Sequence, residues 1–251
     1  MKIIVINFSG NVGKSTVAAH LLKPRMNNAK LFSIETLNNN AASDGVDVET
    51  YKGKKYKELM DEIMLLDDAV VDVGASNVED FSSLMTLYKG SHKQFDCFVV
   101  PTVKEKKQSI DTITTINSLL SMGVPKKKIR IIFNKVEIGD EIKDEFSPLF
   151  GLEAGNYLAL NEKCVIYNNE AFDQCKELSV PLADIVADKT DYQEQAKTAK
   201  NAGDMTEARR CISLALLRMT AITAHENLND VFSALFNGSA HAKQAVESNR
   251  V

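Results

Sequence analysis

The amino-acid sequence predicts an α/β fold in which a doubly wound, mostly parallel sheet is flanked by helices. Two observations lead to this prediction. Short apolar runs alternate with stretches of helical length and pattern along most of the chain. The apolar runs are mostly continuous and do not alternate with polar residues, which is typical of strands that are buried on both faces of a sheet.

The predicted elements follow one another in regular order. Six apolar runs are predicted to be strands, at residues 2–7, 30–35, 68–73, 95–100, 129–134 and 163–167. The stretches with a helical pattern lie near residues 14–26, 53–66, 78–89, 105–122, 140–150 and 169–178. In a sheet of this kind, ligands bind beyond the carboxyl ends of the strands. The residues that follow each predicted strand are therefore the first candidates for a functional site.

The sequence pattern changes near residue 189. We expect residues 1–189 to form the α/β domain and residues 190–251 to form a helical C-terminal extension, packed on that domain or used as an interface. Apolar residues in the extension recur every three or four positions, at Met205, Ala208, Ile212, Ala215, Met219 and Ile222. Such a stripe either packs against the sheet or forms a dimer or partner surface. The stripe continues at Leu228, Val231 and Leu235 after a polar break at Glu226 and Asn227, and residues 237–251 look polar and frayed.

The composition excludes several classes of protein. The chain has 251 residues, of which 44% are hydrophobic and 25% charged, so it is neither disordered, collagen-like nor a disulfide scaffold. The net charge of −4 argues against a protein that coats nucleic acid. Lysine-rich stretches at residues 52–57, 104–107 and 126–128 leave local DNA contact open, as stretches that can share one surface.

Cysteine, histidine and hydropathy add three further expectations. The four Cys and four His residues are scattered without the spacing of metal ligands. No signal peptide is visible, and no apolar segment is long enough to span a membrane. We therefore expect a cytoplasmic protein with free thiols.

The strongest motif follows the first predicted strand directly and opens the next helix. It reads Phe-Ser-Gly-Asn-Val-Gly-Lys-Ser-Thr over residues 8–16. A strand, a loop with two glycines, a Lys-Ser pair and a helix are together the parts of a phosphate-binding P-loop. Gly10 and Gly13 allow the backbone to approach phosphates, and amide groups at a helix N-terminus hold an anion. The motif therefore predicts a nucleotide-binding site with Mg²⁺ as cofactor, and ATP as the nucleotide is what the family resemblance described below implies.

Each residue type in the loop has a chemical role. We expect Lys14 to reach the β and γ phosphates, Ser15 to place its hydroxyl on Mg²⁺, and Thr16 to contact the α phosphate. The other predicted cofactor-binding residues of the loop are Ser9, Gly10, Asn11, Val12 and Gly13.

The loop resembles the deviant Walker A motif of the MinD/ParA family of P-loop ATPases, K-G-G-x-G-K-[ST]-[ST]. The matching residues are Gly10, Gly13, Lys14, Ser15 and Thr16. Asn11 stands in place of the second glycine, and Ser9 stands in place of the signature lysine. In the family that lysine crosses a nucleotide-sandwiched dimer to the phosphates of the partner.

The resemblance extends to other strand ends. Residues 70–74 resemble a Walker B strand, in which Asp72 would hold Mg²⁺ and the Gly74 amide would sense the γ phosphate. Glu35 takes the place of the first acid of the family's Asp-x-Asp, and Leu37 stands at the second. The resemblance thus implies catalytic roles for Lys14, Glu35 and Asp72, and Ser15 and Asp72 as metal ligands. Asn134, at the end of the fifth predicted strand, would contact the adenine edge.

The resemblance covers about residues 1–190. Within the family, the phrase at residues 6–16 is similar to that of the StbB and TraL proteins of conjugative plasmids. It implies an ATP-binding switch with weak ATPase activity, acting in plasmid stability, partition or conjugative transfer. The implied partners are a second copy, in a nucleotide-dependent homodimer, and a plasmid-encoded DNA-binding or transfer protein.

Two other functions stay open at this stage. A nucleotide-binding adaptor that does not hydrolyse ATP is favoured by the uncharged residues Ser9 and Leu37. A small-molecule kinase or synthetase on the same fold would need a substrate pocket with its own acids and bases, which the sequence does not reveal.

Overall fold

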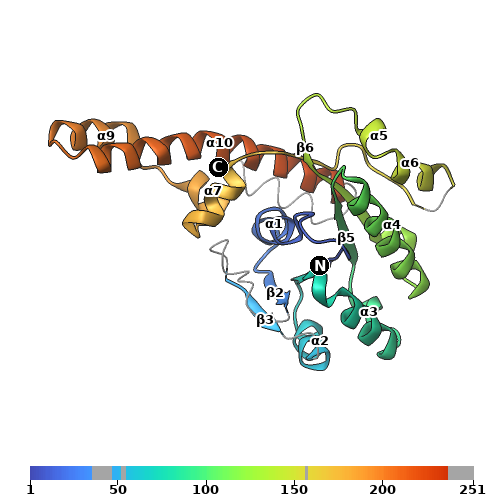
Figure 1. The fold of residues 1–251 in the computed structure, drawn as a ribbon. Coiled ribbons are helices and arrows are strands. Elements are labelled where there is room, and N and C mark those ends of the chain that lie inside the picture. Colours follow the sequence, from blue (N-terminus) through green and yellow to red (C-terminus); the bar gives the residue numbers. More distant parts are fainter. Residues whose placement is uncertain (36–46, 52–54, 156–157, 237–251) are drawn as a thin grey trace.

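The computed structural model describes residues 1–35, 47–51, 55–155 and 158–236. It confirms the predicted fold class, because a single sheet of seven parallel strands has helices on both faces (Figure 1). The strands are β1 (Lys2–Val5), β2 (Lys30–Ile34), β3 (Glu49–Tyr51), β4 (Ala69–Val73), β5 (Cys97–Thr102), β6 (Ile129–Val136) and β7 (Val165–Tyr167).

The order of strands across the sheet is β3-β2-β4-β1-β5-β6-β7. The chain therefore builds one side of the sheet from β1 through β2, β3 and β4, and then crosses over β1 to build the other side from β5. The carboxyl end of β1 lies at this switch point, which is where doubly wound sheets bind their ligands.

Helices cover the sheet in two layers. The helices that follow β1 are α1 (Lys14–Thr16), the π-helix η1 (Val17–Leu22) and the 3₁₀ turn η2 (Lys23–Arg25). The remaining α-helices are α2 (Tyr56–Leu65), α3 (Val78–Leu87), α4 (Lys106–Ser121), α5 (Ile142–Glu145), α6 (Ser147–Ala154), α7 (Ala171–Leu178), α8 (Leu182–Ala187), α9 (Tyr192–Asn201) and α10 (Met205–Phe236).

Each strand divides its side chains between two cores. Ile3 and Val5 of β1 pack in one core with η1, α7, α8 and α10. Ile4, in contrast, packs on the opposite face with residues of α2, α3, α4 and α6. Burial on both faces explains why the strands are mostly continuous apolar runs in the sequence and do not alternate with polar residues.

The structure departs from the sequence prediction at several elements. The strand β3 was not predicted, because its three residues carry no recognisable period. The six-residue helix α8 was not predicted either; it begins after Pro181. The helix predicted near residues 14–26 consists of α1, η1 and η2, and the helix predicted near 140–150 is divided into α5 and α6.

The helix α10 continues through the polar pair Glu226 and Asn227 that interrupts its apolar stripe. The Asn227 side chain donates from Nδ2 to the Val165 oxygen at 2.9 Å and accepts from the Tyr167 amide at 3.1 Å. These are backbone groups of β7, the last strand of the sheet. The polar residue therefore covers a sheet edge and does not end the helix.

A buried arginine links α10 to the helix that follows the first loop. The Arg25 guanidinium donates to the His20 and Leu21 carbonyl oxygens at 2.7 and 3.1 Å. It also donates to Asn229 Oδ1 at 2.8 Å and to the His225 oxygen at 3.2 Å, both on α10. Burial lowers the pKa of Arg25 to about 10, and no carboxylate of the described residues forms an ion pair with it.

The helices α9 and α10 form a hairpin that extends away from the sheet (Figure 1). The predicted apolar stripe of α10 divides between two faces, because Ala208 and Ala215 are buried whereas Ile212 and Met219 are exposed. Among the described residues, no helix combines the length and apolar character that crossing a membrane requires.

Candidate nucleotide-binding site

The loop between β1 and α1 has a strained backbone at two residues. Asn11 and Gly13 have φ angles of 60° and 84°, in the left-handed region that favours glycine. A Cβ atom on Gly13 would lie 2.0 Å from Asn134 Nδ2, so a side chain at this position meets the end of β6. Gly10 does not have a positive φ, and nothing lies within 4 Å of the Cβ atom that a larger residue would place there. The loop geometry therefore requires glycine at position 13 but not at position 10.

Asn7 anchors the loop to the neighbouring strand and helix. Its Nδ2 donates to the Pro101 oxygen at 2.9 Å and to Thr112 Oγ1 at 2.8 Å. Its Oδ1 accepts from the Ser9 amide at 2.8 Å and from Thr115 Oγ1 at 3.3 Å. Sequence reasoning did not assign a role to this residue. The available signal was a buried amide at the end of an otherwise apolar strand.

Lys14 lies inside the loop, and only 7% of the residue is exposed. Its Nζ donates to the Ser9 oxygen at 2.6 Å and to the Asn7 oxygen at 3.1 Å. Burial lowers the pKa of Lys14, while the negative charges of Asp72 and Glu35 oppose this shift. The structure thus holds a poorly hydrated cation at the N-terminus of a helix, where the field favours an anion.

Ser15 and Asp72 form a pair between α1 and β4. The Ser15 hydroxyl donates to Asp72 Oδ2 at 2.6 Å, and Asp72 is almost fully buried. Ser33 of β2 stands beside Asp72 in the register of the sheet. The Ser33 hydroxyl is buried and has no hydrogen-bond partner among the described residues. Two hydroxyl groups and a carboxylate therefore gather at this point, and hydroxyl and carboxylate oxygens are ligands that Mg²⁺ accepts.

Glu35 lies against Gly74 at the ends of β2 and β4. A Cβ atom on Gly74 would lie 2.7 Å from the Glu35 carboxylate, so the absence of a side chain makes room for the acid. Burial raises the pKa of Glu35, and the positive charge of Lys14 opposes this shift. The Gly74 amide donates to the Ile34 oxygen at 3.0 Å. Leu37 lies outside the described residues.

Asn134 closes the loop from the side of β6. Its Nδ2 donates to the Val12 oxygen at 2.9 Å, and the residue is almost fully buried. The amide that was predicted to contact adenine therefore holds the loop backbone in this structure. An adenine contact would require this bond to be exchanged, and the role of Asn134 stays a prediction.

The structure brings the predicted site residues together at the carboxyl edge of the sheet. The loop residues 9–16 follow β1, Glu35 follows β2, Asp72 lies near the end of β4 and Asn134 lies in β6. Lys14, Asp72 and Glu35 lie close enough for the two carboxylates to raise the pKa of Lys14 against the effect of burial. The described residues contain no cluster of His, Cys, Asp and Glu that would suggest another metal centre.

The lysine-rich stretches do not share one surface. Lys104 follows β5 at the carboxyl edge of the sheet, whereas η6 (Lys126–Lys128) precedes β6 at the opposite edge. Lys104 pairs with Asp140 at 3.0 Å, and Lys128 Nζ donates to the Phe95 oxygen at 2.6 Å. Residues 52–54 of the first stretch lie outside the described residues. Direct DNA contact stays a prediction, but one common surface for all three stretches is wrong.

The chain was compared with known proteins by sequence and by structure. No family model matches it, and no curated protein sequence does. The MinC:MinD cell division complex of Aquifex aeolicus covers 84% of this chain and 96% of its own, with 16% identity and a TM-score of 0.54. MinD of the same organism covers 84% and 97%, with 16% identity and a TM-score of 0.49.

A third solved structure is McdA of Cyanothece in complex with ATP. It covers 73% of this chain and 89% of its own, with 14% identity and a TM-score of 0.48. At these identities the similarity concerns the fold alone. The assignment of the fold rests on the MinC:MinD complex, which has the TM-score of 0.54. The chain therefore has a MinD-like fold, with its candidate site in the loop after the first strand.

Proposed function

We propose that this protein is an ATP-binding switch that hydrolyses ATP slowly. One observation carries the proposal: a buried lysine and a Ser–Asp pair meet at the N-terminus of the helix that follows β1. Helix N-termini bind phosphate through their free amide groups, and Lys14 adds a full positive charge at the same place. ATP binding requires Lys14 to exchange the Ser9 and Asn7 carbonyl groups for phosphate oxygens.

The residues present also fit Mg²⁺ as the cofactor. Ser15 and Asp72 would hold the ion, because the hydroxyl and carboxylate are already in contact. The buried Ser33 hydroxyl beside Asp72 supports a polar ligand at this point, since an unbonded buried hydroxyl is otherwise unfavourable. When bound, Mg²⁺ neutralises charge on the phosphates.

Glu35 is the carboxylate we assign to water positioning. It lies beside Gly74 and interacts electrostatically with Lys14, so it is close to the expected phosphates. Its raised pKa makes the carboxylate a better proton acceptor than an ordinary glutamate. A single acid of this kind, without a charged residue at position 9, supports slow turnover.

The biological setting belongs to the same proposal. The loop phrase at residues 6–16 resembles that of plasmid stability and conjugal transfer proteins, so we assign the switch to plasmid stability, partition or transfer. ATP would control association with a second copy or with a plasmid-encoded DNA-binding or transfer protein. The proposed boundary between the nucleotide-binding domain and the helical extension remains at residues 189 and 190.

A second function is favoured by the position of Ser9. Ser9 is 5% exposed, and its carbonyl oxygen accepts a hydrogen bond from Lys14 of the same chain. Position 9 therefore offers no charge to the phosphates of a second copy. A nucleotide-binding adaptor that does not hydrolyse ATP would have this arrangement.

The first prediction tests nucleotide binding. Lys14→Ala is expected to abolish ATP binding, because it removes the only cation that the loop directs toward the phosphates. Isothermal titration calorimetry with ATP and Mg²⁺ measures the loss. Lys107→Ala, which removes an exposed lysine of α4, is the matched control and should bind as the wild type does. Micromolar affinity in a folded Lys14→Ala protein would contradict the site.

The second prediction separates the switch from the adaptor. Phosphate release by the wild type is expected at a turnover below about 1 s⁻¹, the low end of typical enzymes. Glu35→Gln should reduce it further while ATP affinity is retained, because the amide cannot accept the proton. Phosphate release that is indistinguishable from the Lys14→Ala background would favour the adaptor. Turnover well above that limit would contradict both.

A further inference from the structure

A second face of α10 is exposed along the described hairpin. Five large apolar side chains of this helix are exposed, which is unusual: Ile212, Leu216 and Met219 at 51%, 57% and 54%, together with Met205 and Ile222. All of them except Ile222 belong to a row of exposed residues whose spacing alternates between four and three positions. The row, which we call the α10 seam, consists of Met205, Arg209, Ile212, Leu216, Met219, Thr223 and Glu226.

The spacing of the α10 seam is that of a coiled coil. Positions four and three apart in alternation are the a and d positions of a heptad, which face a partner helix. Three apolar residues in a row, Ile212, Leu216 and Met219, lie between Arg209 on one side and Glu226 on the other, and Met205 begins the row. A helix whose second face merely meets solvent has no reason for this order.

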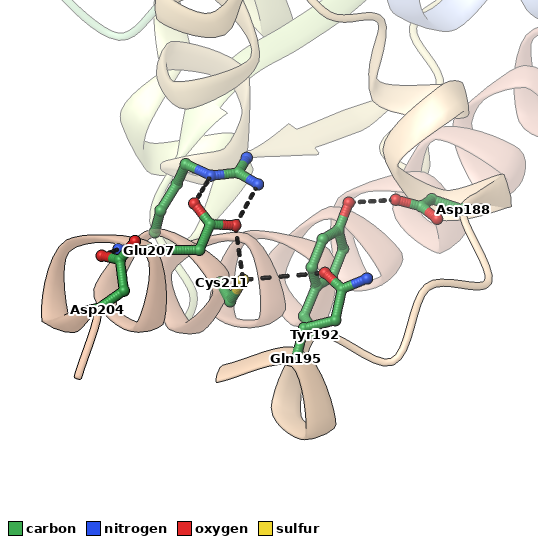
Figure 2. Close-up of polar contacts among 7 residues, drawn as sticks. Asp188, Tyr192, Gln195, Asp204, Glu207 and Cys211 are labelled. Carbon is green, nitrogen blue, oxygen red and sulfur yellow. Dashed lines mark hydrogen bonds and ion pairs between the residues drawn. The ribbon is translucent and has the colours of Figure 1, made fainter. Parts of the chain in front are cut away.

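The other side of α10 is already occupied by α9. The two helices pack closely along the hairpin. Figure 2 shows polar contacts within this region, of which the one between Cys211 and Gln195 joins α10 to α9. Cys211 Sγ lies 3.4 Å from Glu207 Oε1 and 3.9 Å from Gln195 Oε1, and Arg210 binds both Glu207 oxygens at 2.8 Å. The Tyr192 hydroxyl donates to Asp188 at the start of the hairpin. Since α9 is fixed on that side, it does not cover the seam.

We propose that the α10 seam is a contact between two copies of this chain, which pair their α10 helices antiparallel about a two-fold axis between Leu216 and Met219. Antiparallel helices place each a residue opposite a d residue of the partner. This register pairs Leu216 with Met219, Ile212 with Thr223 and Arg209 with Glu226.

The charges at the two ends of the α10 seam favour a second copy of this chain as the partner, and they favour the antiparallel direction. In the antiparallel register, each end of the contact has an arginine opposite a glutamate. In a parallel pair, Arg209 would face Arg209 of the second copy and Glu226 would face Glu226, which is unfavourable. The helix is thus complementary to itself in one direction only, as a two-fold contact requires. The contact spans 17 residue steps from Arg209 to Glu226, or roughly 26 Å of helix.

This inference goes beyond the proposed function, because no residue of the nucleotide loop takes part in it. The dimer is expected without ATP, whereas the nucleotide-dependent association proposed above requires it. An experiment can therefore contradict one of the two associations and leave the other unaffected.

Charge reversal tests the proposal in the full chain. Sedimentation velocity without nucleotide, at up to about 100 μM protein, is expected to show a dimer. Arg209→Glu and Glu226→Arg should each raise the dimer dissociation constant at least about tenfold, because like charges then face each other. The double variant, which exchanges the two charges, should restore the wild-type constant. Lys200→Glu, an exposed residue of α9 off the seam, is the matched control with no expected effect.

Three results would overturn the proposal. The first is a wild-type protein that stays monomeric without nucleotide over this range, which would mean that another helix covers the seam. The second is a dimer whose dissociation constant neither single reversal changes. The third is a double variant that is weaker than both singles. Circular dichroism melting of each variant verifies that the exposed substitutions leave the fold intact.

Discussion

At the scale of single residues, Gly13 connects the backbone of the loop to the far side of the site. Its positive φ and its closeness to Asn134 are separate reasons for glycine, one local and one tertiary. The sequence motif predicts the first reason, because P-loops need unusual dihedral angles. It does not predict the second, because the approach of β6 to the loop depends on the folded sheet.

The third prediction follows from this difference between the two glycines. Gly13→Ala is expected to lower the free energy of unfolding by about 1–3 kcal/mol, because the alanine is strained and meets Asn134. Gly10→Ala is the matched control, with a change within about 0.5 kcal/mol because its surroundings are open. Urea unfolding followed by circular dichroism measures both. Equal midpoints for the two variants would refute the contact.

Other residues of the site could be predicted only in part. Lys14, Ser15 and Asp72 follow from residue type and from their place at strand ends, and the structure brings them together. Asn7 was missed because three of its four hydrogen bonds reach β5 and α4, which are about a hundred residues away in the sequence. The bond from Asn134 to Val12 was missed because the resemblance assigned that amide to a ligand.

At the scale of elements, α10 shows where a pattern of residue types is insufficient. Glu226 and Asn227 interrupt the apolar stripe, and the sequence does not show that Asn227 bonds to the backbone of β7. Likewise, the face on which Ile212 lies depends on α9 folding back beside it, which no local period specifies. Long elements with a clear apolar period were predicted, whereas β3, with three residues, was not.

The fourth prediction concerns the link between α10 and η1. Arg25→Met is expected to lower the free energy of unfolding by at least about 2 kcal/mol, because it leaves buried carbonyl oxygens without a donor. Asn229→Ala removes one acceptor of the same arginine and should cost about 1 kcal/mol. Urea unfolding measures both changes. Hydrogen exchange should become faster in α10 of Arg25→Met, and unchanged exchange there would contradict the link.

At the scale of the whole molecule, the helical C-terminal region and the sheet share one core. Leu217, Leu228 and Phe232 of α10 belong to the same buried cluster as Ile3 and Val5 of β1. The first half of α10 instead extends away from the sheet, together with α9 (Figure 1). One helix is thus anchored in the core beneath the nucleotide loop and reaches outward to the α10 seam.

The outward reach of this helix has a consequence for assembly. A protein with a single two-fold contact assembles only into a dimer, because that contact is used up by one partner. A molecule with a seam on its projecting hairpin and a nucleotide-controlled contact at its loop would carry two such contacts at different places. Copies joined alternately through both would form either a closed ring with an even number of copies or an open strand, and in the open strand the supply of ATP would set the length of the polymer.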